Sequence, residues 1–151
     1  MKKILVIGAT GQIGSALMTK LRKEYGNDNV VAGYIEGVPL SDELKNGGPL
    51  EIADVTNAQQ IAAIIDKYKI DSIYNLAAIL SAQAEKRPLL AWNIQIGGVL
   101  NLLEISREKG CSLFTPSSIG AFGDSSPKMK TPQETIQLSL IHISEPTRLL
   151  S

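Results

Sequence analysis

The sequence predicts an α/β fold built on a Rossmann-type, doubly wound parallel sheet, and three observations predict it. Short apolar runs rich in β-branched residues alternate with segments whose apolar residues recur at helical spacing. A glycine-rich stretch, Gly8 to Gly14, joins the first apolar run to the first helical segment. With 151 residues, of which 44% are apolar and 20% charged, the chain has the size and composition of one packed domain.

Strands are expected where the apolar runs are too short for a helix. The first run, Ile4 to Ile7, is continuous and ends at a glycine, which is typical of a strand buried on both faces. Four later runs have the same character, and we expect strands at residues 30–33, 50–55, 72–78 and 111–115. Because helices separate the strands, the strands are expected to pair in parallel through right-handed crossovers.

Helices are expected in the longer intervals. Ile13, Leu17 and Leu21 recur at helical spacing after the first strand. A second helix is expected to have its apolar face at residues 61–68, and a long third helix is expected at residues 87–109. The polar segment between the second and third strands is expected to be a loop or a short helix.

Composition excludes several classes of function. Fifteen basic residues balance fifteen acidic residues, so no overall field attracts nucleic acid or an anionic membrane. The single cysteine excludes a disulfide framework and a cysteine-rich zinc site. No uninterrupted apolar run approaches the roughly 18 residues of a membrane span, and the run after Lys3 is too short for a signal peptide. We therefore expect a cytoplasmic protein with no metal, nucleic-acid or membrane partner.

The glycine-rich stretch predicts a nucleotide site. Gly8 permits a tight turn after the strand, Gly11 lets the backbone approach a pyrophosphate, and Gly14 lets the helix pack close to the sheet. The start of the helix offers unpaired N–H groups and a partial positive charge to phosphates. The alternative is a glycine-rich turn without a ligand. The residues expected to bind a dinucleotide here are Gly8, Thr10, Gly11, Gln12, Ile13 and Gly14.

The choice of cofactor depends on the end of the second strand. An acidic residue about 20 positions after the glycines would hold the ribose 2′-OH of NAD. Tyr34 falls near that position, Glu36 follows two residues later, and no arginine stands nearby to bind the 2′-phosphate of NADP. The sequence therefore favours NAD, with either Tyr34 or Glu36 at the ribose.

Further cofactor contacts are expected after the third and fourth strands. Asp54 is a candidate to hold the adenine amino group, although an acid at this place can equally form a turn or cap a helix. Ala77 and Ala78 are small, which suits either a cofactor lying against the strand end or simple packing. The residues expected to bind the cofactor in this region are Asp54, Val55, Leu76, Ala77 and Ala78.

Several motifs resemble the extended short-chain dehydrogenase/reductase (NAD-dependent epimerase/dehydratase) family. They are the glycine stretch, Asp54-Val-Thr, Asn75-Leu-Ala-Ala78, Trp92-Asn93 with Asn101, and Pro116 to Gly123. Within that family the chain is most similar to the L-threonine 3-dehydrogenases. This closer likeness rests on Ala77 to Ala82, Glu85-Lys-x-Pro88, Ala91 to Asn93, Thr115 to Gly123 and Thr131 to Thr135.

The resemblance implies an NAD-dependent oxidoreductase that transfers a hydride from a secondary alcohol, converting L-threonine to 2-amino-3-oxobutanoate. It implies that Ser118 is catalytic, that Ser117 and Ser81 contact the substrate, and that Asn93 supports the active-site backbone beside the cofactor. The alternatives are an ST-turn for the serine pair and an exposed helix position for Asn93. The family also implies a homodimer for a full-length protein.

The chain departs from the family after its serine motif. The family uses a tyrosine and a lysine four residues apart as its base, but no tyrosine follows Tyr74, and no tyrosine of this chain has a lysine at that spacing. Residues 138–151 resemble a translated sequencing-library adapter, so we expect a nucleotide-binding domain at 1–137, the N-terminal half only, and a non-native tail. The alternative is a genuine divergent C-terminus. The fragment is expected to be inactive.

Two rival functions remain open. A nucleotide-sugar epimerase or dehydratase uses the same scaffold with another substrate. A non-catalytic NAD(P)-sensing module keeps the glycine stretch and lacks the tyrosine. The native reading frame beyond Gln137 distinguishes the second rival, because an enzyme is expected to encode Tyr-x-x-x-Lys there.

Overall fold

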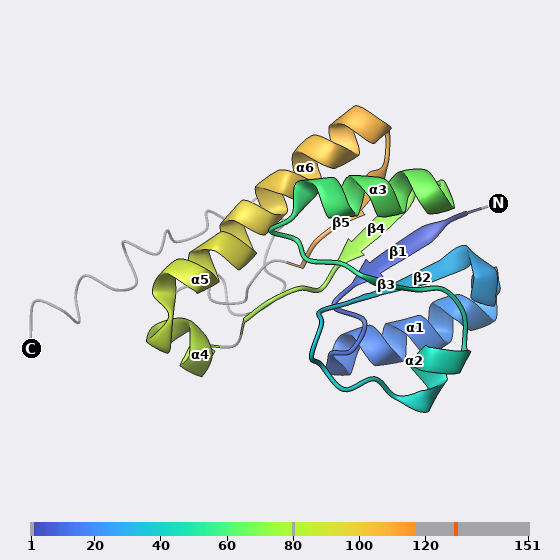
Figure 1. Ribbon diagram of the computed structural model, residues 1–151, viewed down its shortest axis with the longest axis horizontal. Coiled ribbons are helices and arrows are strands. Elements are labelled where there is room, and N and C mark those ends of the chain that lie inside the picture. The colour runs from blue at the N-terminus through green and yellow to red at the C-terminus, as the bar shows by residue number, and fades with distance from the viewer. Residues whose placement is uncertain (1, 80, 117–128, 130–151) are drawn as a thin grey trace, which may run out of the picture. The chain divides into compact units, whose positions relative to one another are not determined.

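The computed structural model describes residues 2–79, 81–116 and 129. The chain divides into two units, Met1–Thr115 and Pro116–Ser151. The first unit holds a five-stranded sheet in which every pair of neighbouring strands is parallel, in the order β3-β2-β1-β4-β5 (Figure 1). The strands are β1 (Ile4–Ile7), β2 (Val30–Tyr34), β3 (Leu50–Ile52), β4 (Ser72–Asn75) and β5 (Ser112–Phe114). The predicted Rossmann-like parallel sheet is confirmed.

The strand order places a topological switch point beside β1. In the register of the sheet, Ile7 at the end of β1 pairs with Gly33 of β2 on one side and Asn75 of β4 on the other. The chain therefore leaves β1 toward β2 and β3, and returns on the opposite side to form β4 and β5. Ligands of such sheets bind outside the carboxyl ends of the strands at this point.

Helices fill the intervals between the strands. They are α1 (Gln12–Tyr25), α2 (Asp42–Asn46), α3 (Ala58–Tyr68), α4 (Ser81–Lys86), α5 (Pro88–Trp92) and α6 (Gly98–Lys109), with a 3₁₀ turn η1 (Asn27–Asn29) and a π-helical stretch η2 (Asn93–Gly97). The long helix expected at residues 87–109 is present as α5, η2 and α6 in succession. The polar segment between β2 and β3, which was expected to be a loop or a short helix, contains the short helix α2.

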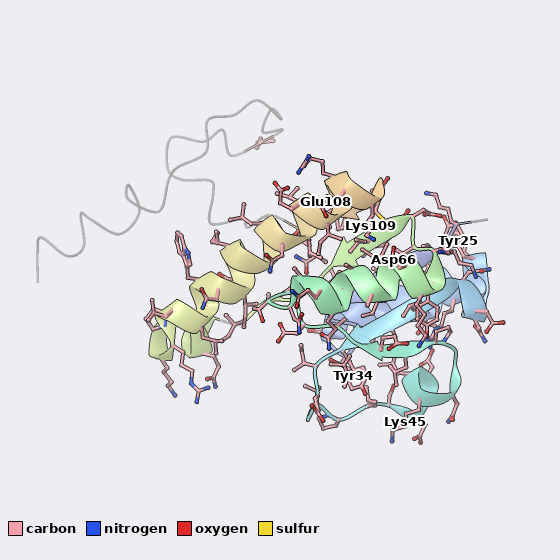
Figure 2. All side chains as sticks on the ribbon, turned by 45° about the horizontal axis from the view of Figure 1, so that its top comes forward. Tyr25, Tyr34, Lys45, Asp66, Glu108 and Lys109 are labelled. Atoms are coloured by element: carbon pink, nitrogen blue, oxygen red, sulfur yellow. The ribbon has the colours of Figure 1, made fainter. Side chains whose placement is uncertain are left out.

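Helices cover both faces of the sheet. Figure 1 shows α3 and α6 on one face and α1 and α2 on the other. Alternate residues of β1 enter the two cores, because successive strand side chains point to opposite faces: Leu5 and Ile7 pack in the core under α3 and α6, and Ile4 and Val6 in the core under α1. The helices α3 and α6 are also joined by an ion pair: Lys109 Nζ donates to both Asp66 carboxylate oxygens, at 2.8 and 2.7 Å (Figure 2).

The buried face of α1 differs from the expected one. Ile13 is 70% exposed, whereas Gly14, Met18 and Leu21 are buried. Ile13 is the second residue of α1 and follows Gly11 and Gln12, which are also exposed, so the start of the helix is not covered by the core. The spacing of Ile13 therefore did not predict its burial.

One helical segment reaches the length and composition of a membrane span. Residues Pro88–Lys109 form 22 helical residues with a mean hydropathy of 1.2 in the best window, which corrects the expectation drawn from uninterrupted runs. Leu102 and Ile105 of this segment are buried against the sheet. Core packing therefore accounts for part of its apolar character, and a core helix passes the same test of length and hydropathy.

Candidate functional site

The glycine stretch is a tight turn fastened to the ends of β1 and β2. Gly8 has a φ of +81°, a conformation that side chains disfavour. The N–H groups of Gly8 and Ala9 both donate to the carbonyl oxygen of Gly33, at 3.1 and 3.0 Å. A Cβ on Gly8 would stand 2.9 Å from the carbonyl carbon of Leu76, just beyond β4. The turn therefore lies at the switch point, between the ends of β2 and β4.

Gly14 lets α1 approach this turn. A Cβ built on Gly14 would stand 2.1 Å from the carbonyl oxygen of Gly8 and 2.9 Å from the Cα of Ala9. Real Cβ atoms do not approach backbone so closely, so only glycine fits. These distances agree with the predicted role of Gly14 in the close packing of helix and strand.

The N-terminus of α1 is open. The helix has 14 residues, its N-cap Gly11 makes no side-chain cap, and its first turn holds no acidic residue. Within the described residues, the N–H groups of Gln12 and Ile13 have no hydrogen-bond partner. Gly11 and Gln12 are exposed, and Thr10 is half-buried beside them. Free N–H groups and the positive end of the helix dipole suit an anion such as a pyrophosphate.

The expected ribose residues begin the connection between β2 and β3. Tyr34 ends β2 and is half-buried, and its carbonyl oxygen accepts the N–H of Ala53 at 2.8 Å. Glu36 follows and is exposed. Figure 2 shows Tyr34 at the start of this connection and Lys45, in α2, within it. Tyr34 thus ends β2 directly after Gly33, which binds the glycine turn, and Glu36 follows two residues beyond the strand end.

Asp54 forms a turn after β3. Its Oδ1 accepts the N–H and the hydroxyl of Thr56, at 2.9 and 2.7 Å, and its own N–H donates to Oε1 of Gln60 at 2.9 Å. The turn-forming alternative is therefore realised, and Oδ1 carries it. A hollow of about 570 Å³ opens here, lined by Asp54, Thr56, Asn57, Ala58 and Gln59. Gln60 was not singled out from the sequence.

Val55 lies beneath this turn. Its side chain is 2% exposed and packs in the core, and a Cβ on Gly98 of α6 would stand 2.6 Å from its Cγ2. Its carbonyl oxygen accepts Nδ2 of Asn101 at 2.9 Å. Val55, which was expected to touch the cofactor, is therefore placed so that its side chain supports the turn from below.

Asn75 is a site residue that sequence reasoning did not select, although it stands in a quoted motif. It ends β4 and is 3% exposed. Its Oδ1 accepts the N–H of Ala77 at 3.2 Å, and its Nδ2 donates to Oγ1 of Thr115 at 3.3 Å. Asn75 thus fixes the bend that carries the half-buried Leu76 and Ala77 and the exposed Ala78. The sequence signal that could have identified Asn75 is a single amide side chain at the end of an apolar strand.

The long helix holds the backbone after β4 through an amide side chain. Nε2 of Gln95 donates to the carbonyl oxygen of Ile79 at 3.1 Å. Asn93 begins the π-helical stretch, is exposed, and makes no hydrogen bond through its side chain within the described residues. Gln95 therefore supports the backbone after β4, and the support of the active-site backbone expected of Asn93 stays a prediction.

The expected substrate and catalytic serines fall outside the described side chains. Ser81 is the first residue of α4, and its side chain is not among those described. Ser117 and Ser118 lie outside the described residues. Among residues 2–79, 81–116 and 129, no group of three or more histidine, cysteine or acidic residues could hold a metal ion.

Known proteins share this sequence pattern and geometry. The chain matches the model of the NAD dependent epimerase/dehydratase family over residues 4–146, a match that extends into the stretch expected to be non-native. An uncharacterized epimerase/dehydratase of Staphylococcus haemolyticus is 53% identical over 137 residues, which are 91% of this chain and 43% of that protein. The chain therefore spans less than half the length of this relative.

Solved structures of longer proteins are also similar to this chain. An L-threonine dehydrogenase from Clostridium difficile is 50% identical with a TM-score of 0.80, over 93% of this chain and 44% of that one. The holo form of an L-threonine dehydrogenase from Cupriavidus necator is 39% identical with a TM-score of 0.80, over 91% and 44%. A UDP-glucose 4-epimerase from Thermotoga maritima, at 24% identity and a TM-score of 0.76 over 91% and 45%, shares the fold. This chain belongs to the NAD dependent epimerase/dehydratase family.

Proposed function

We propose that this chain is the nucleotide-binding part of an NAD-dependent oxidoreductase and that the cofactor pyrophosphate binds at the N-terminus of α1. The observation that carries the proposal is the open helix start, whose N–H groups at Gln12 and Ile13 lie beside a turn that only glycine fits. When bound, NAD accepts the hydride of the oxidised alcohol. The chain contributes backbone donors that hold the cofactor diphosphate.

Residues around the turn suit the remaining parts of NAD. Tyr34 and Glu36 would bind the adenosine ribose, and the hollow beside Asp54 would receive the adenine, with Oδ2 of Asp54 as acceptor for its amino group. Lys45 is the only lysine or arginine between residues 30 and 48, and it faces Asp42 at 3.9 Å. The lack of an arginine there supports NAD over NADP.

We propose L-threonine as the substrate of the whole protein, with 2-amino-3-oxobutanoate as the product. The support is the identity to L-threonine dehydrogenases of known structure together with the motifs Ala77 to Ala82 and Thr115 to Gly123. Ser118 would hydrogen-bond the reacting oxygen, and Ser81 and Ser117 would contact the substrate. Because this sequence has no Tyr-x-x-x-Lys pair to take the alcohol proton, the chain alone is expected to be inactive.

Two measurements test the proposal. Titration of the 151-residue chain with NADH and NADPH, followed by nucleotide fluorescence, is expected to show binding of NADH in preference to NADPH. The whole-length protein is expected to reduce NAD with L-threonine and to leave UDP-glucose unchanged. Failure to bind either nucleotide would overturn the cofactor assignment, and turnover of UDP-glucose alone would replace the substrate.

We also propose that residues 138–151 are not native. Sequencing the source DNA across codon 137 is expected to reveal a different reading frame that encodes Tyr-x-x-x-Lys. Recovery of the same tail from source DNA would contradict this proposal, and a native frame without the pair would favour the sensing module.

A further inference from the structure

A second hollow lies between α1 and α2, away from the glycine turn. It has a volume of about 280 Å³ and is lined by Thr19, Arg22, Lys23, Asn27, Glu43 and Gly47. Three of these residues belong to the C-terminal half of α1, whereas the proposed pyrophosphate site is at the N-terminus of that helix. Figure 1 shows α2 beside α1 on this face of the sheet. The hollow is therefore a separate site.

Arg22 is a buried cation without an ion pair in the described part of the chain. It is 7% exposed, and its Nη1 and Nη2 donate to the carbonyl oxygens of Glu43 and Pro49, at 3.5 and 3.1 Å. Its Nε is buried and has no partner among the described residues. The nearby Glu43 carboxylate instead accepts the Thr19 hydroxyl at 2.7 Å. Buried charges are ordinarily paired, so the missing countercharge calls for a physical explanation.

Arg22 keeps its charge in this place. Burial lowers the pKa of the guanidinium, and the neighbouring Glu43 partly raises it again. Arginine nonetheless stays protonated in proteins because its ordinary pKa is far above neutral pH. The energetic cost of the buried charge is therefore met by hydrogen bonds or by a counterion, and not by loss of the proton.

The lining of the hollow matches a small oxyanion. Lys23 is exposed and adds a second cation, and the Asn27 amide is a neutral donor. Glu43 is the one carboxylate in the lining, so positive charges outnumber negative ones. A Cβ on Gly47 would stand 2.4 Å from the carbonyl oxygen of Glu43 and 2.7 Å from Nη1 of Arg22, so the backbone of α2 leaves no room for a side chain beside the guanidinium. Arginine and lysine together are the usual ligands of phosphate groups.

We propose that the hollow between α1 and α2 binds a small oxyanion of the phosphate type, which supplies the countercharge to Arg22 and is held by Arg22 and Lys23. The volume is below the roughly 300 Å³ at which pockets for larger ligands begin, which suits a single phosphate group. The ligand is either free phosphate or the phosphate of a small ester, since both present the same oxygens.

Thermal unfolding of the 151-residue chain tests this proposal. The melting temperature is followed against the concentration of inorganic phosphate, glycerol 3-phosphate or sodium chloride at constant ionic strength, which gives an apparent dissociation constant. Phosphate also suits the glycine turn, so the measurement is repeated on Gly11→Ala, which alters that turn alone. Either phosphate compound is expected to stabilise wild type and Gly11→Ala equally, and more than chloride does.

Matched variants locate the effect. Lys23→Gln is expected to weaken the apparent affinity for phosphate about fivefold, and Arg22→Met to abolish it. Lys20→Gln removes an exposed lysine of the same helix outside the hollow and is expected to leave the affinity unchanged. If Arg22→Met does not fold, the comparison of Lys23→Gln with Lys20→Gln still shows whether phosphate binds in this hollow. Equal effects of the two lysine variants, or a phosphate effect that disappears in Gly11→Ala, would overturn the proposal.

Discussion

Gly14 and Gly8 are in backbone contact across the start of α1: a Cβ on Gly14 would stand 2.1 Å from the carbonyl oxygen of Gly8. The contact sets the distance between the helix N-terminus and the end of β1. The position of the free N–H groups of α1 therefore depends on the absence of one side-chain atom.

Gly14→Ala is expected to destabilise the fold by about 1–3 kcal/mol, because the added methyl group pushes α1 away from the turn. Gly97→Ala is the matched control, since no atom lies within 4 Å of its Cβ position. Alanine there is expected to be neutral or to stabilise the helix by up to about 1 kcal/mol. Urea unfolding of both variants gives the comparison, and equal midpoints would contradict the close approach.

Asn75 is expected to be essential for the bend after β4. Asn75→Ala leaves the N–H of the half-buried Ala77 without its acceptor, which costs about 1 kcal/mol. The backbone at Leu76 and Ala77 is also expected to become mobile, so its amide protons exchange faster with solvent. Hydrogen exchange measures this directly. Unchanged protection at Ala77 would show that Asn75 does not hold the bend.

Acid is expected to weaken a charged cluster at the edge strand β3. Oε1 of Glu51 accepts Nζ of Lys67 and the hydroxyl of Tyr68, each at 2.6 Å, and these bonds, from Lys67 first, lower the pKa of Glu51. Because the folded pKa is below the unfolded value of about 4.3, the stabilisation is complete above that value and is lost as pH falls through the folded pKa.

Glu51→Gln is therefore expected to lower the melting temperature at neutral pH and to have no effect at a pH below the folded pKa of Glu51. The effect is expected to be small and sensitive to salt, because Lys67 is largely exposed. Glu104→Gln is the control, since Glu104 pairs with Arg107 on an exposed helix face. A pH-independent effect of Glu51→Gln would rule out the charge of Glu51 as its cause.

Cofactor choice is expected to depend on the end of β2. Tyr34→Arg places a guanidinium where the adenosine ribose is proposed to lie, and it is expected to shift the NADPH-to-NADH affinity ratio about tenfold toward NADPH. Lys45 is the only lysine or arginine between residues 30 and 48. Lys45→Arg keeps its positive charge, and it is expected to leave the NADPH-to-NADH affinity ratio unchanged. The ratio of dissociation constants from fluorescence titration checks both. A change of this ratio in Lys45→Arg but not in Tyr34→Arg would indicate that the adenosine ribose binds beside α2.

The sequence predicted the regular part of this fold because that part depends on local periodicity. Alternation of apolar strands and amphipathic helices is sufficient to predict a parallel sheet, and the glycine stretch predicted the turn after β1. Helix α4 was missed because Ser81–Lys86 has no apolar periodicity. The π-helical stretch at Asn93 was missed because composition does not distinguish it from an α-helix.

The supporting contacts of the site were harder to predict because they join distant residues. Asn101 binds the carbonyl group of Val55 across 46 positions, and Asn75 binds Thr115 across 40. Gln95 binds the carbonyl group of Ile79 across 16 positions. Such contacts depend on how helices settle on the sheet, which local sequence does not specify.

Binding of NADH to Gly11→Ala is the decisive test of the proposed diphosphate site at the start of α1. The Cβ of this variant has the carbonyl oxygen of Gly8 as its nearest neighbour, at 3.4 Å, so the fold is expected to persist while the methyl group stands in the path of the diphosphate. We expect NADH to bind wild type and Gly97→Ala equally well, and Gly11→Ala at least about tenfold more weakly. Equal affinity of a folded Gly11→Ala and wild type, or no binding to either, would contradict the proposed site.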